Sequence, residues 1–253
     1  MESSLRPAGR IERMTVLRYT SIPNFEFRVI SLTAVSSLHP VVRMQTERPP
    51  LSLLFAPPVG AIAVHEDVSG AGPGGALWDG SVALAQHVAA TYADGGLAGQ
   101  RVVELGAGTG VPGLVAAKLG ASVVLTDRAR ALPLLRRNAE LNSLSVSVQE
   151  LEWSRRGCAA LLAAGPLHLV LAAECIAHEE SFDVFRDTLL ALSEGGATIL
   201  LANKCRDMRE HGWWKETALQ FEVSVLACGT SDLDRDGDGL PITIYELRRR
   251  AVS

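Results

Sequence analysis

The chain has 253 residues, of which 47% are apolar and 21% are charged. This length and composition favour one α/β domain with additions and a sizeable buried core. The net charge of −4 gives no reason to expect nucleic acid or an anionic membrane as a partner. No apolar run approaches the roughly 18 residues of a transmembrane helix, so a membrane-spanning protein is not expected.

The composition changes along the chain and predicts three regions. Residues 1–50 carry seven arginines and no lysine, lack a clean period, and predict a loosely ordered extension with no share in the core. Residues 51–75 predict a β-hairpin around the turn at 57–60, followed by a glycine-rich linker. Residues 76–253 begin with an amphipathic helix and predict the main domain.

A short apolar strand, residues 101–105, leads into glycines at every second position and then into a helix. The glycines are Gly106, Gly108 and Gly110. Strand, glycine-rich turn and helix is an arrangement that presents backbone N–H groups to a polar small molecule. Because Val111 stands where a dinucleotide-binding motif has its third glycine, the spacing favours S-adenosylmethionine over NAD.

Two acidic residues flank this turn. Asp127 ends the next apolar strand, where an acid is placed to accept two hydrogen bonds from a ribose diol. Glu104 precedes the first glycine and would face the amino group of the ligand or orient the turn. The alternative is a solvated loop acid beside a cluster of turn glycines. The order strand, glycines, helix, strand and acid favours the binding site.

Strands and helices alternate through the rest of the main domain. The predicted helices are 78–90, 132–141, 182–192 and 213–220, and the predicted later strands are 146–151, 167–173, 197–202, 221–227 and 242–247. The last two strands predict an antiparallel hairpin that closes a mainly parallel sheet. The predicted fold class is therefore α/β, a Rossmann-like seven-stranded class I methyltransferase sheet with an antiparallel last strand. A β-hairpin and an irregular N-terminal extension precede it.

No metal site is predicted. The four cysteines are widely spaced and predict reduced thiols of a cytoplasmic or nuclear protein. Residues 232–239 match the first half of an EF-hand loop, but Thr243 stands at the twelfth position, where a bidentate glutamate is required. A solvated loop, or one that meets a basic target protein, is favoured over calcium binding.

Two adjacent tryptophans, Trp213 and Trp214, open the predicted helix before the last hairpin. Neighbours on a helix point about 100° apart, so we expect one to pack inward and the other to stay partly exposed near a docking rim. The alternative is that the N-terminal hairpin covers both.

Several motifs resemble one known family. They are Leu77-Trp78-Asp79-Gly80, the run from Glu104 to Gly113, Thr126-Asp127, Asn138 and Asn142, Leu151-Glu152-Trp153, and the group Ala202, Lys204, Arg206 and His211. With these residues the chain resembles the eukaryotic seven-β-strand protein-lysine methyltransferases of the methyltransferase-like 21 type. Members of that family modify chaperones and translation elongation factors. The resemblance covers residues 55–248.

The resemblance implies a cofactor, a substrate and a set of site residues. The cofactor would be S-adenosylmethionine, and the substrate a lysine side chain of a protein, such as a translation factor or a chaperone, with no nucleic acid or membrane partner. Glu174, after the fourth strand, would orient the acceptor amine. The residues implied to line the cofactor pocket, together with Glu104, are Trp78, Gly106, Gly108, Asp127, Trp153 and Ala173.

One position departs from the family pattern. After the fourth strand the family has an acid, two further residues and a tyrosine that holds the substrate lysine, whereas this chain reads Glu174-Cys175-Ile176-Ala177. The adjacent His178 is a candidate replacement for the missing hydroxyl. Two alternatives therefore stay open, a methyltransferase for another acceptor and a cofactor-binding interaction protein with impaired catalysis.

Overall fold

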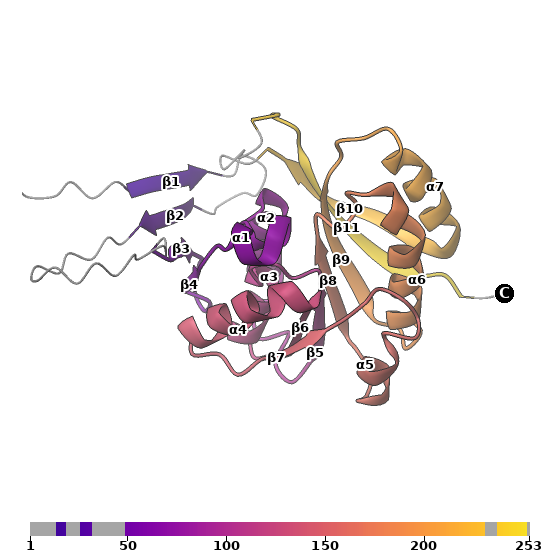
Figure 1. Cartoon of the computed structure of the whole chain (residues 1–253), viewed down its shortest axis with the longest axis horizontal. Helices are drawn as coiled ribbons and strands as arrows, with labels where there is room; N and C mark the ends of the chain where they lie inside the picture. Colours follow the sequence, from indigo (N-terminus) through magenta and orange to yellow (C-terminus); the bar gives the residue numbers. More distant parts are fainter. Residues whose placement is uncertain (1–13, 19–25, 32–48, 231–236, 252–253) are drawn as a thin grey trace, which may run out of the picture.

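The computed structural model describes residues 14–18, 26–31, 49–230 and 237–251. These residues form a large central sheet with helices on both faces and a smaller sheet beside it (Figure 1). Within these ranges, no helix is both long enough and apolar enough to cross a bilayer.

The central sheet has seven strands in the order β7-β6-β5-β8-β9-β11-β10. They are β5 (Arg101–Leu105), β6 (Ser122–Asp127), β7 (Ser147–Glu150), β8 (Leu169–Ala173), β9 (Thr198–Lys204), β10 (Phe221–Gly229) and β11 (Ile242–Arg249). The first five are parallel, and β11 runs antiparallel to both of its neighbours, β9 and β10. The predicted fold class is confirmed.

Helices cover both faces of this sheet (Figure 1). One face carries α2 (Asp79–Thr91), α3 (Val111–Lys118) and α4 (Leu132–Leu141). The other face carries α5 (Ala159–Ala163), α6 (Phe182–Leu192) and α7 (Glu210–Gln220). The 3₁₀ turns η2 (Ala129–Ala131) and η3 (Glu179–Ser181) precede α4 and α6. The sequence did not predict α5, because five residues are too few to show a helical period.

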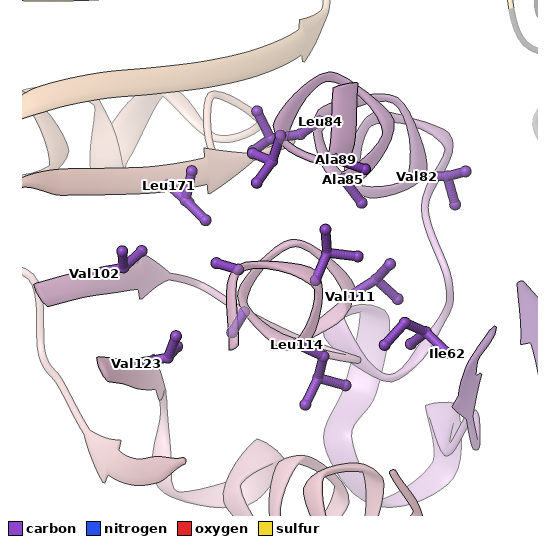
Figure 2. Close-up of a cluster of buried hydrophobic side chains, with 14 of the residues drawn as sticks. Ile62, Val82, Leu84, Ala85, Ala89, Val102, Val111, Leu114, Val123 and Leu171 are labelled. Carbon is purple, nitrogen blue, oxygen red and sulfur yellow. The ribbon is translucent and has the colours of Figure 1, made fainter. Parts of the chain in front are cut away.

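Neighbouring residues of the central strands pack into two different hydrophobic cores, one on each face of the sheet. Val102 and Leu171 pack with α2 and α3, in the cluster that Figure 2 shows, whereas Val103 and Val170 pack under α6. Both faces of the parallel strands are therefore buried, which is why these strands read as continuous apolar runs. Full burial of one such side chain stabilises the fold by roughly 1.5–3 kcal/mol.

The smaller sheet has the antiparallel order β1-β2-β3-β4. Its strands are β1 (Met14–Arg18), β2 (Glu26–Ser31), β3 (Leu51–Leu54) and β4 (Ala61–Val64). The hairpin of β3 and β4 was predicted, but β1 and β2 lie in the segment for which the sequence predicted no regular structure. Regular structure forms in residues 1–50 because β2 is hydrogen-bonded to β3, a strand that lies after these residues in the sequence.

The glycine-rich stretch before α2 is not the simple linker that the sequence predicted. It forms α1 (Val68–Ala71) and the 3₁₀ helix η1 (Gly72–Gly75). Asp67 starts this turn, because its Oδ1 accepts the Gly70 N–H at 2.8 Å, and its own N–H donates to the Gly75 carbonyl at 2.9 Å. The stretch is therefore an ordered helical turn.

The two adjacent tryptophans of α7 divide as predicted. Trp213 is 2% exposed, stacks near Phe185 with ring centroids 5.9 Å apart, and donates its indole N–H to the Phe182 carbonyl. Trp214 is half-buried and packs on Tyr245 of β11, with the two ring centroids 4.1 Å apart. Neighbours in α6 and β11 cover them, rather than the N-terminal hairpin.

Candidate active site

The turn after β5 brings bare backbone to the carboxyl edge of the sheet. Gly106, Gly108 and Gly110 have φ values of 56°, 55° and 83°, which favour glycine. A Cβ at Gly108 would also lie 2.5 Å from the carbonyl oxygen of Gly74, in η1. Glycine is therefore required here on both conformational and steric grounds, and η1 forms one side of this turn.

Asp127 ends β6 directly beside the turn. Its carboxylate is half-buried, with Oδ2 accepting the Gly108 N–H at 2.8 Å and Oδ1 accepting the Arg128 N–H at 2.7 Å. Each carboxylate oxygen has a second lone pair, so both can also accept a hydroxyl donor. The structure thus brings Asp127 and the glycine turn together, and the ribose contact stays a prediction.

Glu104 lies beneath the turn. It is 1% exposed, its Oε2 accepts the Gly113 N–H in the first turn of α3 at 2.8 Å, and burial raises its pKa to about 8. Its backbone carbonyl accepts the Thr126 hydroxyl at 2.6 Å. The carboxylate thus holds the start of α3, which follows the turn, and both roles predicted for Glu104, orientation of the turn and contact with a ligand amino group, stay predictions.

Three more of the predicted pocket residues lie around the same edge. Trp78 directly precedes α2 and donates its indole N–H to the Pro73 carbonyl at 2.9 Å. Trp153 follows β7, and its Cζ2 is 3.4 Å from where a Cβ of Gly106 would stand. Ala173, the last residue of β8, is half-buried. The contact of these three residues with a ligand stays a prediction.

Glu174 directly follows β8 in an unusual backbone conformation. Its φ is 55°, a left-handed value that non-glycine residues rarely adopt, and its N–H donates to the Ala202 carbonyl at 2.9 Å. The side chain is 7% exposed. A Cβ at Gly80 would lie 2.3 Å from Glu174 Oε1, so this carboxylate needs the glycine opposite it.

An ion-pair cluster that the sequence did not predict surrounds Glu174. Arg206 Nη1 donates to Glu174 Oε2 at 2.6 Å, and burial still raises the pKa of Glu174 although Arg206 opposes this. Lys204, 1% exposed, places Nζ 2.6 Å from Asp238 Oδ1 and 3.8 Å from Asp79 Oδ2. The family resemblance named Lys204 and Arg206, but only the fold reveals their carboxylate partners.

Asp238 belongs to the acidic loop between β10 and β11. Residues 231–236 of that loop lie outside the described residues, and so does most of the EF-hand-like run. Asp238 itself faces the site, because it pairs with Lys204 and its Oδ2 is 3.7 Å from Arg206 Nε. This part of the loop therefore contributes to the site.

A buried glutamate in α7 shapes the loop that carries Arg206. Glu210 is 3% exposed, and its Oε1 accepts the N–H groups of Arg206 and Asp207 at 2.9 and 3.1 Å. Its Oε2 accepts an amide N–H of Asn203 at 2.6 Å. The loop after β9 is thereby fixed against the end of its own strand. Nothing in the sequence pattern indicated this role.

Asn138 in α4 and Asn142, which directly follows α4, have structural roles that the motif alone did not reveal. Asn138 binds both the N–H and the carbonyl of His65, and also the Thr109 carbonyl in the glycine turn. Asn142 binds both backbone groups of Ala63 in the same way. The two side chains connect the edge of β4 to the main domain.

Ala177 and His178, at the place of the family tyrosine and just after it, are both exposed. The sequence offered His178 as a replacement for the tyrosine hydroxyl. Its backbone carbonyl accepts the Ser181 hydroxyl. The replacement of the tyrosine hydroxyl by His178 stays a prediction.

The geometry fits S-adenosylmethionine. The positive-φ glycines leave no side chain in the ligand's path, Asp127 ends the second strand beside them, and Trp153 lies against Gly106. Trp78 is hydrogen-bonded to Pro73 of η1, the 3₁₀ helix that contacts the turn at Gly108. The strand order and this site define the class I S-adenosylmethionine-dependent methyltransferases. S-adenosylmethionine is the cofactor of this class.

Comparisons with known proteins identify the family. A family described as lysine methyltransferase matches residues 59–219. The chain is 36% identical over 167 residues to "Protein N-lysine methyltransferase METTL21A" of Danio rerio, covering 64% of this chain and 75% of the relative. It is 33% identical over 183 residues to "EEF1A lysine methyltransferase 3" of Mus musculus, covering 70% and 73%. The chain belongs to the lysine methyltransferase family, and the predicted resemblance to the methyltransferase-like 21 type is confirmed.

A solved structure supports the fold. The T. thermophilus 16S rRNA N2 G1207 methyltransferase, in complex with AdoMet and guanosine, matches with a TM-score of 0.51 and 16% identity. The match covers 93% of this chain and 51% of that one. At this identity the likeness shows a shared fold and nothing of the acceptor.

Proposed function

We propose that this chain transfers the methyl group of S-adenosylmethionine to a lysine side chain of a protein. The observation that carries the proposal is the position of Glu174, directly after β8 and at the same sheet edge as the glycine turn. Strand pairing aligns Leu105 of β5 with Ala172 of β8, so the glycine turn after β5 and the loop after β8 leave the sheet side by side. On its other side β8 pairs with β9, where Ala173 is aligned with Ala202. The family membership supports the same reaction.

The residues of the site divide the work of an in-line displacement. When bound, S-adenosylmethionine supplies an electrophilic methyl carbon on a sulfonium. The glycine turn and Asp127 would hold and orient the cofactor, and Trp78 and Trp153 would exclude water. The acceptor amine must be neutral when it attacks, and the Glu174 carboxylate would orient it and stabilise the developing positive charge.

The substrate proposed is a translation factor, with a chaperone as the second candidate. The name of the mouse relative states EEF1A as its target, which supports the first. Because Ala177 supplies no hydroxyl, recognition of the lysine would depend more on Glu174 and Trp78 than in the family pattern. We also propose a cytoplasmic or nuclear location, which the four free cysteines support.

Two measurements on one variant test this function. We expect Glu174→Gln to bind S-adenosylhomocysteine within about twofold of wild type by calorimetry, and to lose radiolabelled methyl transfer into a cell lysate. Glu179→Gln is the matched control, because Glu179 lies five residues on and its carboxylate is 60% exposed. Wild-type transfer by Glu174→Gln would refute the role of Glu174. Cofactor binding without transfer by the wild type would favour a cofactor-binding interaction protein.

A further inference from the structure

The carboxylate assigned to the acceptor amine already holds a cation. Glu174 Oε2 accepts the Arg206 Nη1–H at 2.6 Å. Glu174 Oε1 is buried against Gly80 and has no hydrogen-bond partner among the described residues. An incoming amine that binds this carboxylate must therefore compete with Arg206.

Arg206 has the surroundings of a bound amine. Its guanidinium lies 5.9 Å from the centroid of the Trp78 ring, and Glu174 contacts it from the end of β8. A carboxylate beside an aromatic face is a usual environment for an organic cation. The side chain reaches this place from the loop after β9, 32 residues from Glu174. The pair therefore depends on the tertiary fold.

The Arg206 side chain is more exposed than its neighbours in the cluster, and its Nη1 also donates to the Lys204 carbonyl at 3.2 Å. Its side chain is 34% exposed, whereas the neighbouring Lys204 is 1% exposed and fixed between carboxylates. Asp238, 26% exposed, already has Oδ2 at 3.7 Å from Arg206 Nε and can receive the guanidinium.

We propose that Arg206 is a resident cation that occupies the acceptor position on Glu174, and that the substrate amine displaces it toward Asp238. This inference rests on the proposed function, in which Glu174 receives the acceptor. The exchange would make the site selective for cations, because only a cation that competes with the Arg206 guanidinium can bind the Glu174 carboxylate. No bond to carbon is made or broken in this exchange.

The test uses n-butylammonium as a probe of the acceptor position. The full chain is saturated with S-adenosylhomocysteine and titrated with n-butylammonium chloride by calorimetry. We expect Arg206→Ala to bind the probe at least tenfold more tightly than wild type. Adding Glu174→Gln should reverse the gain, and neutral n-butanol should show none. Arg209→Ala is the matched control, because Arg209 lies in the same loop and pairs with Asp207 and Glu179.

The outcomes separate this inference from the proposed function. Equal probe binding by wild type and Arg206→Ala, or no binding by a folded Arg206→Ala, would overturn the inference and leave the methyltransferase assignment standing. Failure of the wild type to bind S-adenosylhomocysteine would instead refute the proposed function, and the inference with it. If Arg206→Ala does not fold, Arg206→Met replaces it. Failure of both to fold would make Arg206 a structural anchor and overturn the inference.

Discussion

Asn138→Ala removes a side chain that connects three parts of the molecule. Asn138 is fully buried in α4, and its Oδ1 accepts the His65 N–H at 2.8 Å. Its Nδ2 donates to the carbonyls of His65 at 3.2 Å and Thr109 at 3.0 Å. The first two bonds hold the end of β4, and the third holds the glycine turn.

The magnitude follows from the number of bonds and their burial. A typical hydrogen bond contributes about 0.5–1.5 kcal/mol net, and a buried group left without its partner costs more. Three bonds of a fully buried side chain therefore predict that Asn138→Ala lowers the free energy of unfolding by about 2–4 kcal/mol. Asn142→Ala also loses three bonds, but its side chain is half-buried and water can replace part of them. We expect Asn142→Ala to lower the free energy of unfolding by about 1–2 kcal/mol.

Urea denaturation and calorimetry with S-adenosylhomocysteine measure the two consequences separately. Both variants should be destabilised, because both release β4. Only Asn138→Ala should weaken cofactor binding, by several-fold, because only Asn138 contacts Thr109 in the turn. The reasoning fails if Asn138→Ala unfolds within about 0.5 kcal/mol of wild type. It also fails if both variants lose cofactor affinity equally.

Three further predictions concern the site. Asp127→Ala should weaken S-adenosylhomocysteine binding by about 1.5–3 kcal/mol, because the ribose and the Gly108 N–H lose a charged acceptor, and unchanged calorimetric affinity would remove Asp127 from the site. Burial raises the pKa of Glu104 from 4.5 to about 8. Between pH 4.5 and about 8 the folded chain therefore keeps a proton on Glu104 that the unfolded chain has lost. The free energy of unfolding should therefore fall as pH rises from about 4.5 to 8, by at most about 1.4 kcal/mol per unit, and Glu104→Gln should show a flatter profile in urea titrations at several pH values. Ala177→Tyr should raise radiolabelled methyl transfer without changing S-adenosylhomocysteine affinity, because position 177 is exposed and the change restores the family hydroxyl. A rate equal to wild type would show that this hydroxyl has no part in the reaction here.

The parts that the sequence predicted well depend on local order. The strand, the alternating glycines, the helix and Asp127 occur within 27 residues and are read from spacing alone. The inward and outward division of Trp213 and Trp214 follows from helix geometry. These features need no knowledge of distant contacts, which is why the structure and the sequence agree on them.

The parts that the sequence missed depend on distant partners. Arg206 meets Glu174 across 32 residues, and Asn138 meets His65 across 73. The glycines of η1 predicted a flexible linker. The structure has an ordered turn there because Asp67 caps the preceding helix α1. The pairing of β2 likewise requires β3. No local pattern records such contacts, because the topology creates them.

The place of β11 in the sheet also affects how the polypeptide is completed during synthesis. β11 is the last described strand along the chain, yet it lies between β9 and β10. A nascent chain that ends before Ile242 leaves β9 without its neighbour and β10 without any strand beside it. Open strand edges promote intermolecular pairing, so prematurely terminated products should be prone to aggregation and clearance. Asp238 enters the site four residues before this strand, so the ion pair with Lys204 can form only after the chain has been translated past β10 and the loop that follows it.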